Sequence, residues 1–191
     1  MSDKNITYKA FEPSDIQAVI TLGNLVHGDN YLDTKKAEYL YQASIKNNIN
    51  ASRVAYDQQQ LVGFRLTQAA MQWHIDQWCS PDLWGHPKEN VCYFKCNTVD
   101  ERYRGYGIGS TLLKLSIKQA EKQGAQAGLA HIWLASPGNS AFKYFSKCGG
   151  KLVKEHPNRW QPLCQNDGYI CPVCDGLCTC TAAEMIIHFN R

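Results

Sequence analysis

The stretch "TVDERYRGYGIGSTLL", residues 98–113, constrains this chain more than any other feature of the sequence. A strand pattern runs into Gly105, Gly107 and Gly109, and a helical pattern begins directly after them. Alternating glycines remove Cβ atoms from the turn, so a ligand can approach the backbone closely. The free N–H groups at the start of the helix, together with the helix dipole, favour an anion such as phosphate. The stretch therefore predicts a phosphate-binding turn.

Three phosphate motifs compete for this turn, and one of them fits. A Walker A loop requires a lysine after the glycines, and none follows here. A dinucleotide fingerprint that starts at Gly107 requires Gly or Ala where this chain has Leu112. The pattern R-x-x-G-x-G is matched in full by the segment 104–109.

With this motif the sequence resembles the GNAT superfamily of acyl-CoA-dependent N-acyltransferases. In that family R-x-x-G-x-G/A follows the fourth strand and cradles the pyrophosphate of coenzyme A. The resemblance implies an α/β (α+β) fold with a mixed, mostly antiparallel central sheet flanked by helices. It implies that acetyl-CoA is bound by Val99, Arg104, Gly105, Tyr106, Gly107, Ile108, Gly109, Ser110 and Asn139.

The order of predicted elements supports the resemblance over residues 5–190, apart from a cysteine-rich stretch. We expect strands at 6–10, 52–56, 61–69, 91–99, 129–136, 151–156 and 184–189. We expect helices at 12–26, capped by Ser14, at 33–47, capped by Asp33 or Thr34, at 107–124 and at 139–149. The stretch 71–90 is expected to be a long loop or a partly helical excursion. We therefore expect one N-acetyltransferase domain over residues 1–191, with a cysteine-rich insertion at 161–181.

The resemblance implies transfer of an acetyl group from acetyl-CoA to a primary amine. The main chain of Val99 would pair with the pantetheine arm, and a backbone N–H there would polarise the thioester carbonyl. The family often carries a tyrosine four residues before the glycine that ends its fourth helix. Here that position is Phe145, and Tyr144 is its neighbour. Tyr144 is the candidate catalytic residue, and we expect catalysis to depend on it only weakly.

Three alternatives remain open for Tyr144: the helix register shifts by one residue, Tyr144 only packs, or the thiolate leaves without a protein acid. Asn139 has two interpretations as well, a contact with pantetheine or the N-cap of a helix. No single general base is identified. The candidates are His74, Asp76, Asp82, His86 and Glu101. The aromatic residues that line an acceptor cleft, or are simply buried, are Trp73, Trp78 and Trp84.

Five of the nine cysteines lie in the stretch 164–180. The spacing C-x2-C-x3-C-x-C predicts a structural zinc site with Cys171, Cys174, Cys178 and Cys180 as ligands. Cys164 is a reserve ligand that would replace Cys178 or Cys180, and His156 and His188 are weaker alternatives. Reduced free thiols and an adventitious disulfide also remain possible. The spacing departs from that of ferredoxin-type iron–sulfur proteins.

Charge and hydropathy exclude several other classes. A net charge of +3 does not suggest a nucleic-acid partner. The polar N-terminal stretch shows no secretory signal, and no apolar run approaches the roughly 18 residues of a membrane span. We expect a cytoplasmic protein, and the oligomeric state is not predicted. The alternative function is a catalytically weak GNAT-fold protein that acts as a zinc-knuckle interaction or sensing module.

Overall fold

A computed structural model of the chain describes residues 5–189, so the first four residues of the polar N-terminal stretch lie outside it. Its centre is a seven-stranded sheet with the strand order β1-β4-β5-β6-β7-β9-β8. The strands are β1 (Ile6–Ala10), β4 (Arg53–Asp57), β5 (Gln60–Gln68), β6 (Val91–Val99), β7 (Ala127–Trp133), β8 (Lys151–His156) and β9 (Ala182–His188). Every neighbouring pair is antiparallel except β6 and β7. The expected mixed, mostly antiparallel sheet is confirmed.

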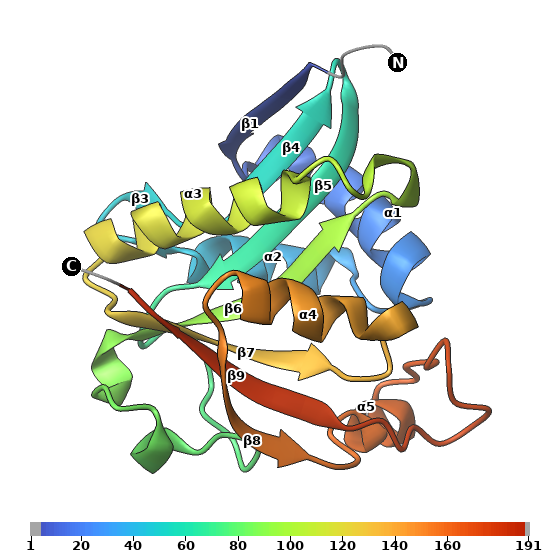
Figure 1. Cartoon of the computed structure of the whole chain (residues 1–191). Helices are drawn as coiled ribbons and strands as arrows, with labels where there is room; N and C mark the ends of the chain where they lie inside the picture. Colours follow the sequence, from blue (N-terminus) through green and yellow to red (C-terminus); the bar gives the residue numbers. More distant parts are fainter. Residues whose placement is uncertain (1–4, 190–191) are drawn as a thin grey trace.

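The parallel pair β6–β7 is short. Residues Val91–Tyr93 pair with Ala127–Leu129, and within residues 5–189 this pairing does not continue toward Val99. Figure 1 shows the two strands diverging beyond this point, with the start of α4 near the opening. Where β6 and β7 separate, their facing backbone N–H and C=O groups no longer pair with each other and are accessible to a ligand.

A β-bulge in β6 decides which side chains face which side of the sheet. The register pairs Leu66 with Cys96 but Thr67 with Phe94, so Lys95 is an extra residue. A bulge reverses the alternation of side chains along the strand beyond it. Phe94 packs with the α4 side of the core, whereas Cys96 packs with the α1 and α2 side.

Helices cover both faces of the sheet (Figure 1). The helices α3 (Ile108–Lys122) and α4 (Ser140–Lys147) lie on one face, and α1 (Ile16–His27) and α2 (Thr34–Ala43) lie on the other. In α3 the buried residues recur at helical spacing: Ile108, Leu112, Leu113, Ser116 and Ala120. Gly63 of β5 lets α3 approach the sheet, because a Cβ there would lie 3.2 Å from Ile108.

Several boundary predictions were wrong, each for a local reason. Ser14 does not cap α1: a 3-10 turn, η1 (Pro13–Asp15), precedes the helix, and Glu12 and Asp15 form a capping box. The Asp33 cap is confirmed, with its side chain accepting from the Lys36 N–H at 2.7 Å.

The second helix ends at Ala43, well before the predicted boundary at 47. A short hairpin of β2 (Ile45–Lys46) and β3 (Ile49–Asn50) takes over, with Asn47 and Asn48 at φ of 53° and 59°. Two adjacent asparagines are a recognisable signal for such a tight turn. The strand expected at 129–136 is β7, shifted toward the N-terminus to Ala127–Trp133.

The stretch 71–90 is a loop as expected, with two 3-10 turns, η2 (Pro81–Leu83) and η3 (Lys88–Asn90). Between β8 and β9 the chain forms a helix that the sequence did not predict, α5 (Gln161–Asn166). The residues 167–181 that follow contain no helix or strand. No helix in the described part of the chain has the length and apolar character to span a membrane.

Candidate functional site

The glycine turn between β6 and α3 has the geometry that the sequence predicted. After β6 the chain makes a 3-10 turn, η4 (Glu101–Tyr103), and enters α3 through Gly105 and Gly107 at φ of 86° and 75°. A Cβ added at either glycine would meet no atom within 4 Å. The turn is therefore open, and positive φ rather than crowding explains why glycine stands there. The first N–H groups of α3 lack partners within the helix, so they are available to an anion.

Tyr144 lies beside this turn. Its hydroxyl donates to the carbonyl of Gly109 at 2.7 Å and accepts from Nη2 of Arg65 at 3.3 Å. Burial raises the pKa of Tyr144, so the phenol is protonated at neutral pH. Phe145 instead points into the core, where it is 1% exposed and packs edge-on against Phe94. Of these two neighbours on α4, Tyr144 is the one near the glycine turn.

Two side-chain amides near the split between β6 and β7 have buried oxygens without a hydrogen-bond partner in the described structure, those of Asn97 and Asn139. Asn97 lies next to the turn, since its Nδ2 would be 3.1 Å from a Cβ on Gly109. Asn139 takes the N-cap position of α4 at φ 54° but makes no side-chain cap hydrogen bond. Such oxygens are expected to find a donor. A ligand with amide N–H groups would supply one.

A pocket of about 330 Å³ opens among the α1–α2 loop, α2, the 71–90 loop and the strands β6 and β7. The α1–α2 loop contributes Tyr31 to its lining, and α2 contributes Lys36 and Tyr39. From the loop and the strands come Trp73, His74, Asp76, Tyr93, Lys95 and His131. Small-molecule pockets begin at roughly this size.

The pocket separates the general-base candidates. His74 and Asp76 line it, whereas Asp82, His86 and Glu101 are not among its lining residues. His86 instead lies 2.9 Å from His188, ring nitrogen to ring nitrogen. Of the three tryptophans, Trp73 lines the pocket and stacks on Tyr93, with ring centroids 4.8 Å apart. Trp84 is fully buried.

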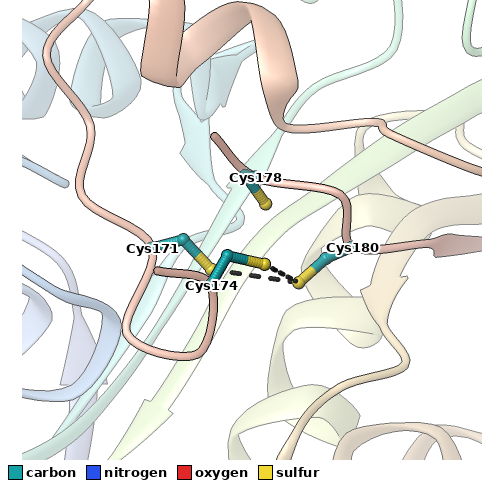
Figure 2. Close-up of side chains that lie close together, drawn as sticks. All are labelled: Cys171, Cys174, Cys178 and Cys180. Atoms are coloured by element: carbon teal, nitrogen blue, oxygen red, sulfur yellow. Dashed lines mark hydrogen bonds between the residues drawn. The ribbon is translucent and has the colours of Figure 1, made fainter. Parts of the chain in front are cut away.

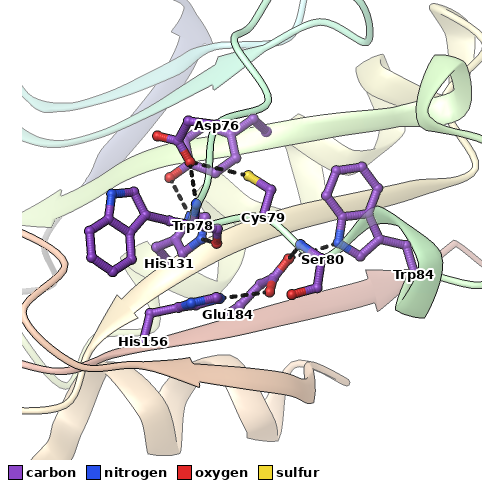
Figure 3. A network of polar contacts seen from close by, with 9 residues as sticks. Asp76, Trp78, Cys79, Ser80, Trp84, His131, His156 and Glu184 are labelled. Carbon is purple, nitrogen blue, oxygen red and sulfur yellow. Dashed lines mark hydrogen bonds and ion pairs between the residues drawn. The ribbon is translucent and has the colours of Figure 1, made fainter.

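A polar network adjoins the pocket, and its members Asp76, Cys79 and His131 also line the pocket (Figure 3). Nε2 of His131 lies 2.6 Å from the carbonyl of Trp78, so it carries the proton, and Nδ1 then accepts from the hydroxyl of Tyr93 at 2.9 Å. Burial lowers the pKa of His131 to about 4, so its imidazole is neutral at pH 7. The Asp76 carboxylate accepts from the N–H of Trp78 at 2.9 Å and pairs with Arg159 at 3.4 Å.

The innermost member of this network is Glu184 on β9, which is 0% exposed. It accepts from the N–H of Ser80 and from Nε1 of Trp84, both at 2.8 Å, and it pairs with Nε2 of His156 at 2.9 Å. Burial alone would raise the pKa of Glu184, but these hydrogen bonds outweigh it and the pKa is lowered. His131, His156 and Glu184 lie close enough to share a metal ion, yet their hydrogen bonds within the protein already satisfy them.

A cysteine–histidine pair on the α1 side of β6 was missed in the sequence. Sγ of Cys96 lies 3.4 Å from Nε2 of His27, which in turn lies 2.7 Å from the hydroxyl of Thr98. Burial raises the pKa of the Cys96 thiol, but the charge and hydrogen bond of His27 dominate and lower it to about 7. Residues 27 and 96 are far apart in the chain, so no spacing could have indicated the pair.

The four cysteines of the predicted metal site converge in the segment before β9 (Figure 2). The sulfur atoms of Cys171, Cys174, Cys178 and Cys180 all lie within 4.8 Å of one another. Cys164 packs against this cluster from α5 but is not one of the four. Of the weaker alternatives, His156 pairs with Glu184 and His188 with His86, away from the cluster.

The structure is thus an α/β protein whose sheet splits between the parallel strands β6 and β7, with an open glycine turn between β6 and α3 of the kind that suits an anion. The family model described as "Acetyltransferase (GNAT) family" matches residues 20–149. The chain therefore belongs to the GNAT acetyltransferase family.

Solved structures with low sequence identity share the whole fold. Ard1 from Thermoplasma volcanium has 17% identity and a TM-score of 0.68, with 97% of this chain and 99% of that chain covered. The ribosomal-protein-S18-alanine N-acetyltransferase from Escherichia coli has 14% identity and a TM-score of 0.66, with coverage of 97% and 95%. YncA from Salmonella typhimurium, solved with its cofactor acetyl-CoA, has 15% identity and a TM-score of 0.69, with coverage of 98% and 95%. No curated protein matches the chain in sequence.

Proposed function

We propose that this protein transfers an acetyl group from acetyl-CoA to a primary amine. The observation that carries the proposal is the open turn at Gly105 and Gly107, which leads into α3 in a chain of the GNAT family. Similarity to yncA, which was solved with acetyl-CoA, supports the choice of cosubstrate. The unpartnered amide oxygens of Asn97 and Asn139 fit the same molecule, because the pantetheine arm carries two amide N–H groups.

In this proposal the residues of the turn divide the work of binding. The N–H groups at the start of α3 and the side chain of Arg104 hold the pyrophosphate. Asn97 and Asn139 accept hydrogen bonds from the pantetheine amides. The main chain at Val99, the last residue of β6, lies at the split in the sheet and polarises the thioester carbonyl through a backbone N–H.

Tyr144 is the candidate donor of the proton that the leaving thiolate needs. Its O–H is already given to the carbonyl of Gly109, so donation to a thiolate requires that this hydrogen bond be broken. We therefore assign Tyr144 a small contribution to turnover and a larger one in holding the first turn of α3.

The acceptor amine enters from the pocket lined by Tyr93 and Asp76. The hydroxyl of Tyr93 donates its proton to Nδ1 of neutral His131. The lone pairs of the Tyr93 oxygen can therefore accept a hydrogen bond from the amine. The Asp76 carboxylate already accepts from the N–H of Trp78 and pairs with Arg159. In this proposal it therefore contributes negative charge that attracts an ammonium group, and it does not remove the proton of the amine. The lysines Lys36 and Lys95 also line the pocket, so an acceptor screen should include amines with and without a carboxylate.

The test compares Gly107→Asp with Gly107→Asn. Both side chains have the same shape and tolerate positive φ better than other residues, so they differ in one negative charge. A unit charge within about 5 Å of a phosphate weakens binding by about 1–3 kcal/mol, which is roughly fivefold to 150-fold in Kd. Calorimetry with coenzyme A should show this difference. Gly109→Asp should weaken binding of coenzyme A as well, since a Cβ added at residue 109 would lie 3.1 Å from Nδ2 of Asn97.

Activity is then measured as thiol release from acetyl-CoA with a panel of amines. Equal Kd values for wild type and all three variants would contradict the proposed site. Normal coenzyme A binding without thiol release for any amine would instead favour the alternative of a catalytically weak protein of this fold.

A further inference from the structure

The four cysteines between α5 and β9 have the separations of a tetrahedral metal site. Sγ of Cys180 lies 3.8 Å from that of Cys171 and 3.4 Å from that of Cys174. In tetrahedral zinc thiolate sites the Zn–S distance is about 2.3 Å, which gives sulfur separations of about 3.8 Å along each edge. The observed separations are close to this edge and far from a disulfide bond of about 2.0 Å. Each of the four is a free cysteine in the structure.

The segment 167–181 has little else to hold it in place. It contains no helix or strand, and its large apolar side chains point outward, with Ile170 62%, Val173 55% and Leu177 47% exposed. Its buried side chains are cysteines instead: Cys171, Cys178 and Cys180 are 4%, 1% and 7% exposed. From outside the segment, Trp133, Ala135 and Trp160 pack against these cysteines. A loop of this length with so few apolar contacts is not expected to be ordered by packing alone. Thiolates bound to a metal supply the missing stabilisation.

The same segment forms one wall of the acceptor pocket. Tyr169 and Asp167 line the pocket, as do Leu163 and Arg159 just before them. The hydroxyl of Tyr169 donates to the carbonyl of His27, at the end of α1, at 3.3 Å. The carbonyl of Ile170 lies only 2.8 Å from where a Cβ on Gly28 would stand. The cysteine segment, residues 167–181, therefore contacts the start of the α1–α2 loop, which supplies Tyr31 to the same pocket.

We propose that Cys171, Cys174, Cys178 and Cys180 bind one Zn²⁺, and that this ion fixes Tyr169 and its neighbours as the wall of the acceptor pocket. The zinc site is inferred from the positions of the sulfur atoms alone. The role of residues 167–181 in acceptor binding also rests on the proposed acetyltransferase function. With four protein ligands the ion has no open position for water, so it is structural. Binding releases the thiol protons to solvent as the four sulfurs become thiolates.

The metal is tested by native mass spectrometry and elemental analysis of the full chain, purified under reducing conditions without chelator. Wild type should carry one zinc per chain. The double variant Cys171→Ser/Cys174→Ser should carry none. Cys164→Ser is the matched control, because Cys164 packs on the cluster without belonging to the four, and it should keep one zinc. A metal-free wild type, an iron-containing wild type, or zinc lost in the Cys164 variant would each overturn the assignment.

The wall is tested by hydrogen exchange and by binding, in the same three proteins. Loss of zinc should increase exchange in residues 167–181 and at the end of α1, and leave exchange in α3 unchanged. It should raise the KM for the acceptor by about tenfold, within the usual range of coupling between two sites, while the Kd for coenzyme A stays within about twofold. Unchanged exchange at the end of α1 in the zinc-free variant would overturn the wall, even if no acceptor had been found. Loss of coenzyme A binding together with zinc would also overturn it, because the ion would then support the whole fold.

Discussion

Removal of the Tyr144 hydroxyl separates two roles for this residue. In Tyr144→Phe the ring stays and two hydrogen bonds are lost, one to the carbonyl of Gly109 at 2.7 Å and one from Arg65 at 3.3 Å. A hydrogen bond typically contributes about 0.5–1.5 kcal/mol net, and the longer bond belongs at the low end. The free energy of unfolding should therefore fall by about 1–2 kcal/mol, which lowers Tm by roughly 2–8 °C for a chain of this size.

The effect on turnover is predicted to be smaller than a proton donor would give. A general acid contributes typically about 10²–10⁴-fold to rate. Because the O–H of Tyr144 is committed to Gly109, we expect turnover to slow by less than about tenfold, with the Kd for coenzyme A nearly unchanged. The thiolate then leaves largely without help from this side chain.

The control is Tyr56→Phe, which also removes one partly buried hydroxyl. Tyr56 donates to the carboxylate of Asp15 at 2.6 Å, away from the glycine turn, so its loss should lower Tm and leave turnover alone. Thermal unfolding and steady-state thiol release on the three proteins give the comparison. If Tyr144→Phe turns over more slowly by about a hundredfold or more, the size of effect typical of a general acid, while coenzyme A binds as before, the reasoning is refuted and Tyr144 is the proton donor.

Two further predictions concern the network that adjoins the pocket. The pKa of His131 lies near 4 in the folded chain, below its ordinary value of 6.5, so the stability that its neutral form contributes is present above pH 6.5 and is lost as pH falls toward 4. The loss amounts to about 3 kcal/mol. In His131→Gln the free energy of unfolding, measured with guanidinium between these pH values, should depend less steeply on pH than in wild type. Equal pH dependence in the two proteins would argue against this role of His131. Glu184→Gln should cost about 2–4 kcal/mol, because the amide oxygen can still accept from Ser80 and Trp84 but the NH2 group replaces the oxygen that pairs with Nε2 of His156. The exposed Glu155→Gln should be nearly neutral in the same denaturation assay, and a comparable loss there would remove the special role of Glu184.

The sequence by itself determined the features that depend on residues close together in the chain. The glycine turn at 105–109, the strand β6 at Val91–Val99 and the helical spacing of α3 depend on local backbone preferences and on the burial of one face, so they could be predicted. The C-x2-C-x3-C-x-C spacing likewise predicted that four cysteines come together, because two turns that close on one point need only short stretches of chain.

The tertiary structure decided what depends on residues far apart in the chain. The bulge at Lys95 arises from a one-residue change of register in the pairing of β5 with β6, and it sets which face of the sheet Cys96 occupies. The network of Glu184 joins β9 to a loop about a hundred residues earlier, and no periodicity links them. The segment 167–181 contributes Asp167 and Tyr169 to the pocket, and the Tyr169 hydroxyl contacts the end of α1, more than a hundred residues earlier in the chain. Local propensity carries no information on such contacts, since each is selected by the packing of the whole sheet and its two layers of helices.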